Sequence, residues 1–430
     1  MSSLLIKNGF GLDSSSRLEG MADVLVRDGM IAQVAPAGQI SGAEEVFDAT
    51  GLAVSPGFID LHVHLREPGQ SHKETIATGT TAAAAGGFTS VCCMPNTDPV
   101  NDLPAITRWM LQSERGARVN VFPIAAATVG SAGERLTDFA GLRREGAVAV
   151  TDDGKPILHE GMMREALAQA SALGIPVIQH AEDTTLTKGA VMHQGSRAFR
   201  MGVRGMPSEA EWKVVARDIQ LARETGAHLH VAHISTAKAV QAVREAKQQN
   251  IRVTCEVTPH HFALTDEDIR DYDSNYKMNP PLRSPADRDA MIAGLLDGTI
   301  DAIATDHAPH ALHEKRQEFD RAPFGIIGLE TALGLAIRIL HAEHGMKLGR
   351  VIELLTTGPV GVLSNTEVGR RGRLRAGAPA DIAIFDPAAK WNYDAAQSRS
   401  KSHNTPFNEW ELQGRVVATM VSGGFVFRSS

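Results

Sequence analysis

The chain has 430 residues, of which 43% are hydrophobic and 22% are charged, and it carries a formal net charge of −7. That length suits one large domain with a smaller one beside it, and the composition is typical of a globular protein. The acidic balance argues against a general nucleic-acid binder, although a few local cations would be enough to bind a small anion.

The cysteines and the first residues bear on the cellular compartment. Cys92, Cys93 and Cys255 cannot form a disulfide framework, which favours a reducing compartment. The N-terminus lacks the basic start and long apolar core of a signal peptide, and no run of about 18 apolar residues predicts a membrane span. We therefore expect a cytoplasmic protein with neither a nucleic-acid nor a membrane partner.

Residues 1–54 predict short strands. Apolar runs lie at residues 4–9 and 24–34, and they contain the dipeptides Asn8-Gly9 and Asp28-Gly29. Both dipeptides are typical of tight hairpin turns, so we expect the chain to turn at each of them.

Residues 55–365 alternate short apolar strands with helices. The expected strands are residues 58–64, 89–94, 120–125, 147–150, 176–180, 228–233, 251–257 and 301–304. The clearest expected helices are residues 161–173, 208–225, 236–249 and 284–296. Ser208 and Glu211 have the pattern of a capping box at the start of one of them. Such alternation predicts a parallel sheet, and eight units predict an α/β fold of the TIM-barrel type, (β/α)8.

Residues 366–430 return to the character of the N-terminal part. Apolar runs lie at residues 380–386 and 416–424, and no helical periodicity separates them. We expect residues 1–54 and 366–430 to meet in one small β-sandwich beside the barrel.

Histidine and aspartate residues follow the ends of the expected strands. A TIM barrel brings the C-terminal ends of its strands to one rim, where such residues would converge. His62 and His64 lie two residues apart on one strand, so they face the same side and can reach one ion. Imidazole and carboxylate ligands suit Zn²⁺. The predicted ligands, enough for one or two ions, are His62, His64, Asp153, His180, His233 and Asp306.

Each of these residues has an ordinary explanation when it is taken alone. His180 or His233 could be a core histidine, and Asp306 could cap a helix. Asp153 could be a turn residue, because Gly154 follows it. Their convergence on one rim favours a metal site over these separate explanations.

Four motifs resemble those of a known family. Residues 57–64 (GFIDLHVH) are similar to the first strand of the amidohydrolase superfamily. Residues 65–69 (LREPG), 94–97 (MPNT) and 304–310 (ATDHAPH) resemble the dihydroorotase family of the long bacterial type, class I. The motifs agree in order and spacing, and the resemblance extends over nearly the whole chain.

The resemblance implies a zinc hydrolase that interconverts N-carbamoyl-L-aspartate and L-dihydroorotate in pyrimidine synthesis. It implies that the six ligands above hold one or two Zn²⁺ ions. Relatives form homodimers or associate with aspartate transcarbamoylase, so the resemblance leaves both assemblies open for this chain. The implied substrate contacts are Arg66, Asn96, Asn279 and His310, with backbone groups of Phe324 and Gly325.

The residues themselves agree with an anionic substrate. Arg66 lies two residues after His64 and therefore points toward the same rim, where its guanidinium could clamp a carboxylate. An exposed salt bridge is the alternative explanation for Arg66. We expect zinc to activate a water molecule, and Asp306 to take its proton and deliver it to the leaving nitrogen.

One feature departs from many relatives. Hydantoinases, allantoinases and some dihydroorotases bridge two metals with a carboxylated lysine from the fourth strand. Here the only lysine between residues 101 and 180 is Lys155, past the strand end, so we assign the bridging carboxylate to Asp153. The alternatives are another cyclic amidohydrolase, such as an allantoinase or hydantoinase, and a silent dihydroorotase-like subunit that scaffolds aspartate transcarbamoylase. Residues 310–323 could form a lid or an ordinary exposed loop.

Overall fold

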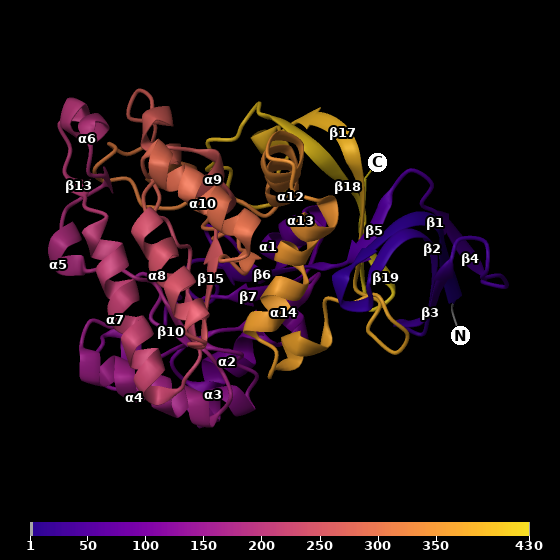
Figure 1. Cartoon of the computed structure of the whole chain (residues 1–430), viewed down its shortest axis with the longest axis horizontal. Helices are drawn as coiled ribbons and strands as arrows, with labels where there is room; N and C mark the ends of the chain where they lie inside the picture. The colour runs from indigo at the N-terminus through magenta and orange to yellow at the C-terminus, as the bar shows by residue number, and fades with distance from the viewer. Residues whose placement is uncertain (1–2, 430) are drawn as a thin grey trace.

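The computed structural model describes residues 3–429, which form two parts lying side by side (Figure 1). One part is a ring of parallel strands surrounded by helices. The other is a sheet to which both ends of the chain contribute. The barrel is the predicted α/β architecture, and both chain ends meet beside it as expected. Their strands form one hydrogen-bonded sheet, where the sequence predicts a β-sandwich.

The barrel strands are parallel and follow one another in sequence order. Hydrogen-bonded sheets of three and six strands make up the ring, and β8 and β9 share one position in it. Val63 pairs in parallel with His307, which joins the last strand to the first. The strands are β6 (Phe58–Val63), β7 (Phe88–Cys93), β8 (Asn120–Pro123), β9 (Ala125–Ala126), β10 (Val150–Thr151), β11 (Val177–Gln179), β14 (Leu229–Val231), β15 (Val253–Val257) and β16 (Ala302–Ile303).

Helices surround the ring (Figure 1). They are α1 (Ile76–Ala85), α2 (Pro104–Met110), α3 (Phe139–Arg144), α4 (Glu160–Ala172), α7 (Glu209–Thr225), α8 (Ala237–Gln248), α10 (Pro285–Asp297), α12 (Ala332–Ala336), α13 (Leu348–Leu355) and α14 (Thr357–Val362). Shorter elements lie in the connections: α5 (Thr184–Thr187), β12 (Met192–His193), α6 (Ser196–Met201), β13 (Gly205–Met206), α9 (Pro259–Ala263) and α11 (Leu312–Lys315).

Apolar side chains from opposite sides of the ring fill its interior. One buried cluster joins residues of the first, second, fifth and eighth barrel strands, including Ile59, Cys92, Ile178 and Ala302. A larger cluster packs the strands against the helices that cover them. This filled interior places the polar strand ends at the rim, where the sequence predicts the site.

The second part is a single sheet in the strand order β19-β18-β17-β5-β1-β2-β3, with β4 paired to β1. Antiparallel pairing of β5 with β17 joins the N-terminal strands to the C-terminal ones. The division of the chain at residues 55 and 366 stays a prediction. The strands are β1 (Ser3–Asp13), β2 (Leu18–Arg27), β3 (Met30–Pro36), β4 (Glu45–Asp48), β5 (Ala53–Pro56), β17 (Ile382–Asn392), β18 (Glu411–Val421) and β19 (Gly424–Arg428).

The two predicted glycine turns have different outcomes. Asp28 and Gly29 take φ values of 49° and 79° between β2 and β3, which confirms a hairpin turn there. The turn expected at Asn8-Gly9 is wrong, because both residues lie inside β1 at an irregularity in its pairing with β2. A Cβ on Gly9 would lie 2.4 Å from Val54 Cγ2, so close packing explains this glycine.

The predicted capping box at Ser208 is also wrong. Ser208 makes no side-chain capping hydrogen bond to α7. The carboxylate of Glu211 instead accepts from the backbone N–H groups of Ser235 at 3.0 Å and Thr236 at 2.9 Å. Glu211 therefore braces the connection after β14, close to the rim, rather than the start of its own helix.

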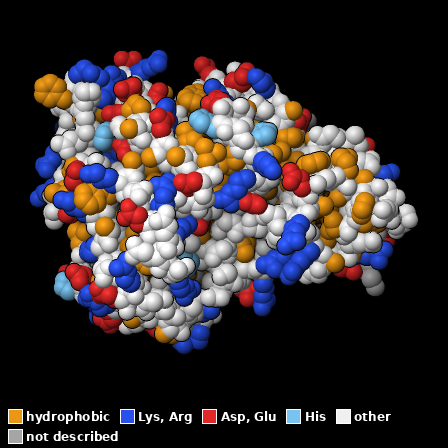
Figure 2. Space-filling model, viewed as in Figure 1, with side chains coloured by type: hydrophobic (Ala, Val, Ile, Leu, Met, Phe, Trp, Pro, Cys, Tyr) orange, Lys and Arg blue, Asp and Glu red, His pale blue; other side chains and the backbone are white. Residues whose placement is uncertain are grey.

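Acidic and basic side chains lie interspersed over the face shown in Figure 2. Within residues 3–429, no helix has the length and apolar character needed to cross a membrane.

Candidate metal and substrate site

The six predicted metal ligands all lie at the C-terminal rim of the barrel, and all are buried. His62 is in β6 and His64 follows directly after it. The other four come just after a strand end, because the parallel ring turns every such end toward one face. They are Asp153 after β10, His180 after β11, His233 after β14 and Asp306 after β16.

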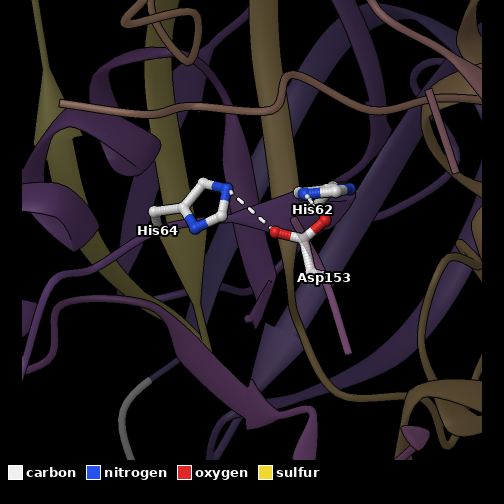
Figure 3. Close-up of side chains that lie close together, drawn as sticks. All are labelled: His62, His64 and Asp153. Atoms are coloured by element: carbon white, nitrogen blue, oxygen red, sulfur yellow. Dashed lines mark ion pairs between the residues drawn. The ribbon is translucent and has the colours of Figure 1, made fainter. Parts of the chain in front are cut away.

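Two groups of possible metal ligands share Asp153. His62, His64 and Asp153 form one group, and Asp153, His180 and His233 form the other, with the ligand atoms of each within 4.8 Å of one another. The carboxylate of Asp153 lies 3.5 Å from His62 Nε2 through Oδ1 and 3.7 Å from His64 Nε2 through Oδ2 (Figure 3). This arrangement suits a bridging carboxylate between two cations.

Asp306 lies on the side of the first group. Its Oδ1 is 3.0 Å from His64 Nε2 and 3.5 Å from His62 Nε2. Burial alone would raise the pKa of Asp306, but the charge of His62 and the hydrogen bond with His64 outweigh it and hold that pKa below its usual value. The carboxylate is therefore ionised at neutral pH.

The nitrogen atoms of this cluster fit a bound cation. His62 Nε2 is buried and has no hydrogen-bond partner among the described residues. Burial would lower the pKa of His62, but Asp153 and Asp306 outweigh it and raise that pKa well above its usual value. The site therefore attracts positive charge, and a metal cation could replace the proton there.

Neighbouring acids orient two of the imidazoles. Glu256 on β15 lies 3.2 Å from His62 Nδ1, so the opposite ring nitrogen faces the site. Glu182 does the same for His180, with Oε2 2.9 Å from Nε2. Carboxylate–histidine pairs of this kind fix the tautomer of metal-binding imidazoles. Sequence reasoning missed both acids, although Glu256 is the one charged residue of β15.

Asn96 and Asn279, predicted to contact substrate, lie against the ligand residues. The Oδ1 atom of Asn96 is 2.9 Å from His64 Nδ1, and its amide donates to Asp153 Oδ2 at 2.9 Å. Asn279 donates to Glu182 Oε2 at 2.7 Å. Both amides therefore join the hydrogen-bonded shell around the ligand groups.

Arg66, His310 and residues 324–325 form a separate corner of the site, which we call the anion corner. Arg66 is buried, and its Nε donates to the carbonyl of Pro309 at 3.1 Å. His310 Nε2 lies 2.7 Å from the carbonyl of Phe324. A carbonyl only accepts, so this ring nitrogen carries the hydrogen. It therefore cannot also accept from Arg66 Nη2, 3.2 Å away, so within residues 3–429 the terminal guanidinium hydrogens have no acceptor and can bind a ligand.

The environment keeps His310 neutral. Burial, followed by the nearby charge of Arg66, lowers the pKa of His310 to about 2. Arg66 is thus the charged group of the anion corner, and its burial argues against the exposed salt bridge that was the alternative explanation.

Several residues of the site have backbone angles that side chains rarely adopt. Arg66, His233 and Asp306 have φ values of 61°, 30° and 47°. Residues in this left-handed region cost free energy, and such residues cluster at functional sites. The strand ends here are bent so that their side chains point into the site.

Two further predictions concern nearby segments. Lys155 is exposed, in agreement with its interpretation as a loop residue. Residues 310–323 are only partly exposed: Lys315 and Phe319 are buried, whereas Leu312 is exposed. Whether this segment moves as a lid stays a prediction.

Known proteins resemble this chain over nearly its whole length. Residues 51–239 match the family model described as Dihydro-orotase-like. A dihydroorotase of Solibacter usitatus is 53% identical, with 98% of this chain and 97% of the relative covered. A dihydroorotase of Citrifermentans bemidjiense is 47% identical, with 99% of this chain and 100% of the relative covered.

Solved structures show the same fold. The L-hydantoinase (dihydropyrimidinase) of Arthrobacter aurescens superposes with a TM-score of 0.88 at 24% identity, covering 100% of this chain and 96% of the other. A D-hydantoinase from Bacillus sp. AR9 has a TM-score of 0.82 at 27% identity, covering 99% and 95%.

Proposed function

This chain belongs to the dihydroorotase family, and from that premise we propose that it interconverts N-carbamoyl-L-aspartate and L-dihydroorotate. It is an enzyme of cyclic amide hydrolysis, acting in the cytoplasm in pyrimidine synthesis. The observation that carries the choice of substrate is the anion corner. A buried guanidinium with free terminal hydrogens, next to paired metal-ligand groups, suits a cyclic amide that bears a carboxylate.

Zinc is the proposed cofactor, with one or two ions per chain. His62 and His64 would hold it on one side of Asp153, and His180 and His233 on the other. Imidazole nitrogens with one carboxylate are a donor set that suits zinc. When bound, zinc supplies a Lewis acid that polarises the amide carbonyl and lowers the pKa of water.

In ring opening, a carbon–oxygen bond forms between water and the ring carbonyl carbon, and the ring carbon–nitrogen bond breaks. Asp306 is ionised and accepts a proton from the water. The same carboxyl group then delivers that proton to the departing nitrogen. Ring closure runs through these steps in reverse.

The other side chains hold the substrate still. Arg66 would bind the carboxylate through its two terminal nitrogens, and the Nε bond to Pro309 fixes the plane of the guanidinium. The backbone of residues 324–325, and the amide hydrogens of Asn96 and Asn279 that are not bonded to Asp153 and Glu182, would supply hydrogen bonds to the ring. Holding the ring against Asp306 lowers the entropic part of the barrier.

Two rivals fit less well. Hydantoin and allantoin lack the carboxylate that would occupy the anion corner. A silent scaffold subunit has no need of a full set of ligand residues, and all six are buried together here. A homodimer or a complex with aspartate transcarbamoylase is the proposed assembly, and light scattering of the protein with and without that partner distinguishes the two.

A substrate comparison tests the proposed function. Purified protein should hydrolyse L-dihydroorotate much faster than hydantoin or allantoin, because only the first offers a carboxylate to Arg66. A chelator should abolish the activity, and added zinc should restore it. Faster turnover of hydantoin than of dihydroorotate would show that the substrate is wrong.

Asp306→Ala supplies the matched inactive control. It should lose turnover by at least about a thousandfold while retaining the circular dichroism of the parent, because it removes the proton carrier and no core packing. Activity near that of the parent would mean that another group carries the proton.

A further inference from the structure

A segment from beyond the barrel reaches back to the site. Residues 400–407 lie between β17 and β18 of the sheet, yet most of them are buried. Ser402 donates to the carbonyl of Lys73 at 2.6 Å, and Lys401 N donates to Glu74 at 3.1 Å. The segment is thus fastened across the rim, although the sequence suggests only a sheet for this part of the chain.

Asn404 is the residue of this segment that touches the anion corner. Its side chain is buried, with 5% of its surface exposed. The amide nitrogen donates to the carbonyls of Ala308 at 3.1 Å and Gly325 at 3.0 Å. The amide oxygen accepts from the backbone N–H of His310 at 3.0 Å. Both amide hydrogens and the oxygen are therefore in use, which is what a buried amide requires.

The hydrogen bonds of Asn404 lie on both sides of Pro309, whose carbonyl orients Arg66. Ala308 and His310 flank Pro309, whose carbonyl accepts from Arg66 Nε. Pro309 has no N–H of its own, so the backbone groups on either side must fix this turn. Because Asn404 bonds to both Ala308 and His310, the orientation of the Pro309 carbonyl between them is fixed.

The same side chain closes the other half of the corner. Gly325, held through its carbonyl, follows Phe324, which accepts from His310 Nε2. The two segments lie so close that a Cβ on Gly325 would be 2.6 Å from Ala308 Cβ. The backbone oxygen of Asn404 also accepts from Ile327 N at 2.9 Å. Asn404 thus ties residues 308–310 to residues 325–327.

We propose that Asn404 is a positioning residue that sets the geometry in which Arg66, His310 and residues 324–325 receive the substrate carboxylate. The inference rests on the proposed function, because it assumes that this corner binds the substrate anion. Asn404 has no direct contact with the metal-ligand residues among its hydrogen bonds in residues 3–429. Its loss should therefore weaken substrate binding while sparing metal binding.

The test compares Asn404→Asp and Asn404→Ala with the parent enzyme. Asn404→Asp keeps the size and the acceptor but loses both donors, and it faces two carbonyl oxygens with a carboxylate oxygen. Both variants should raise KM for L-dihydroorotate at least about tenfold and change kcat by less than about threefold, with zinc content unchanged.

Ser402→Ala is the matched control. It removes a buried hydrogen bond from the same segment, two residues away, but one that leads to Lys73 rather than to the anion corner. Its KM should stay within about twofold of the parent. An equal rise of KM in Ser402→Ala would show that any loosening of the segment suffices and would overturn the specific role of Asn404.

Other outcomes also decide the matter. KM unchanged in Asn404→Asp, or a loss confined to kcat and accompanied by lost zinc, overturns the inference. If Asn404→Ala does not fold, the Asp variant and titration calorimetry of L-dihydroorotate binding to it carry the test. A parent enzyme inactive on dihydroorotate would instead refute the proposed function, so the two failures are distinguishable.

Discussion

Glu256 lies between two imidazoles, with a hydrogen bond to His62 and a close ionic contact to His230. Oε1 lies 3.2 Å from His62 Nδ1, and Oε2 lies 3.2 Å from His230 Nε2. Burial would raise the pKa of Glu256, but the contacts with His230 and His62 outweigh it and lower that pKa to about 2. An ionised carboxylate behind His62 makes the opposite ring nitrogen a better metal ligand.

The zinc affinity of Glu256→Gln tests this role. Glutamine keeps the size but removes the charge, so we expect zinc affinity to fall about 10- to 100-fold, measured by competition with a chromophoric chelator. Glu330→Gln is the control, because Glu330 accepts from Ser398 and Arg399 and not from a ligand residue. Equal zinc affinity in the parent and Glu256→Gln would show that Glu256 only fills space.

For single residues, the sequence predicts the metal ligands better than it predicts the residues that contact and orient those ligands. His62 and His64 are visible because spacing on a strand brings two imidazoles to one side. Glu256 is not, because its partners are 26 and 194 residues away and only the closed ring brings them together. Asn404 is hidden for the same reason, and nothing in its own segment indicates a barrel contact.

The segment from His310 to Gly325 is held by two buried ammonium groups. Lys315 donates to the carbonyls of Pro323 at 2.9 Å and Gly325 at 3.1 Å. Lys277 donates to the carbonyls of Asp320 and Ala322. Burial, followed by the charge of Lys277, lowers the pKa of Lys315 to about 7. The segment is therefore fastened by groups whose protonation changes near neutral pH.

Lys315 should make the stability of the protein depend on pH. In the unfolded chain a lysine releases its proton near pH 10.4, so between about pH 7 and 10 the unfolded state binds more protons than the folded one. The free energy of unfolding should rise with pH across that window. Below about pH 7 both states hold the proton, so the effect of Lys315 on stability no longer changes with pH.

Urea unfolding at about pH 7.5 and about pH 9 checks this expectation. The parent should gain more stability over this range than Lys315→Met, by up to about 1.4 kcal/mol for each pH unit. Lys390→Met, which changes an exposed lysine of the sheet, should match the parent. The same slope in all three proteins would place the pKa of Lys315 at its ordinary value.

Elements with strong local signals were predictable. The four helices expected from periodicity are observed within one residue of their predicted ends, as α4, α7, α8 and α10. The strand expected at residues 147–150 is observed at Val150–Thr151, because regular pairing is limited to Val150, which pairs with both neighbouring strands, and Thr151, which pairs with β9. The predicted capping box at Ser208 does not form, because the carboxylate of Glu211 accepts from backbone N–H groups in the connection after β14. The local sequence pattern contains no information about that connection.

Across the whole molecule, the ligand cluster concentrates charge inside the barrel. Asp153 and Asp306 lie among four buried histidines, and removing bound cations leaves these groups to be balanced by protons. A cation that binds the folded state alone stabilises it, by about 2.7 kcal/mol at a concentration a hundred times its Kd.

Metal removal should therefore lower the melting temperature by several degrees. We expect added zinc to restore it and magnesium to fail, because magnesium prefers oxygen donors. Scanning calorimetry of chelated and reloaded protein measures the difference. Identical melting curves would mean that the site contributes nothing to global stability.

The architecture as a whole follows from alternation of strands and helices, which a TIM barrel repeats. The strand pairing of the sheet was harder to predict from the sequence. Its strands are recognisable, but the pairing of Ala53 with Phe385 and of Pro56 with Ile382 spans most of the chain, and short patterns carry no information over that distance.

That pairing also sets a constraint on synthesis. A ribosome delivers β5 early, and its open edge must wait for β17 while the entire barrel is made. An unpaired strand edge is a template for association with other chains, so the nascent protein is prone to aggregate until β17 has been made. Synthesis of β17, rather than of the barrel alone, is therefore needed before the edge of β5 is paired.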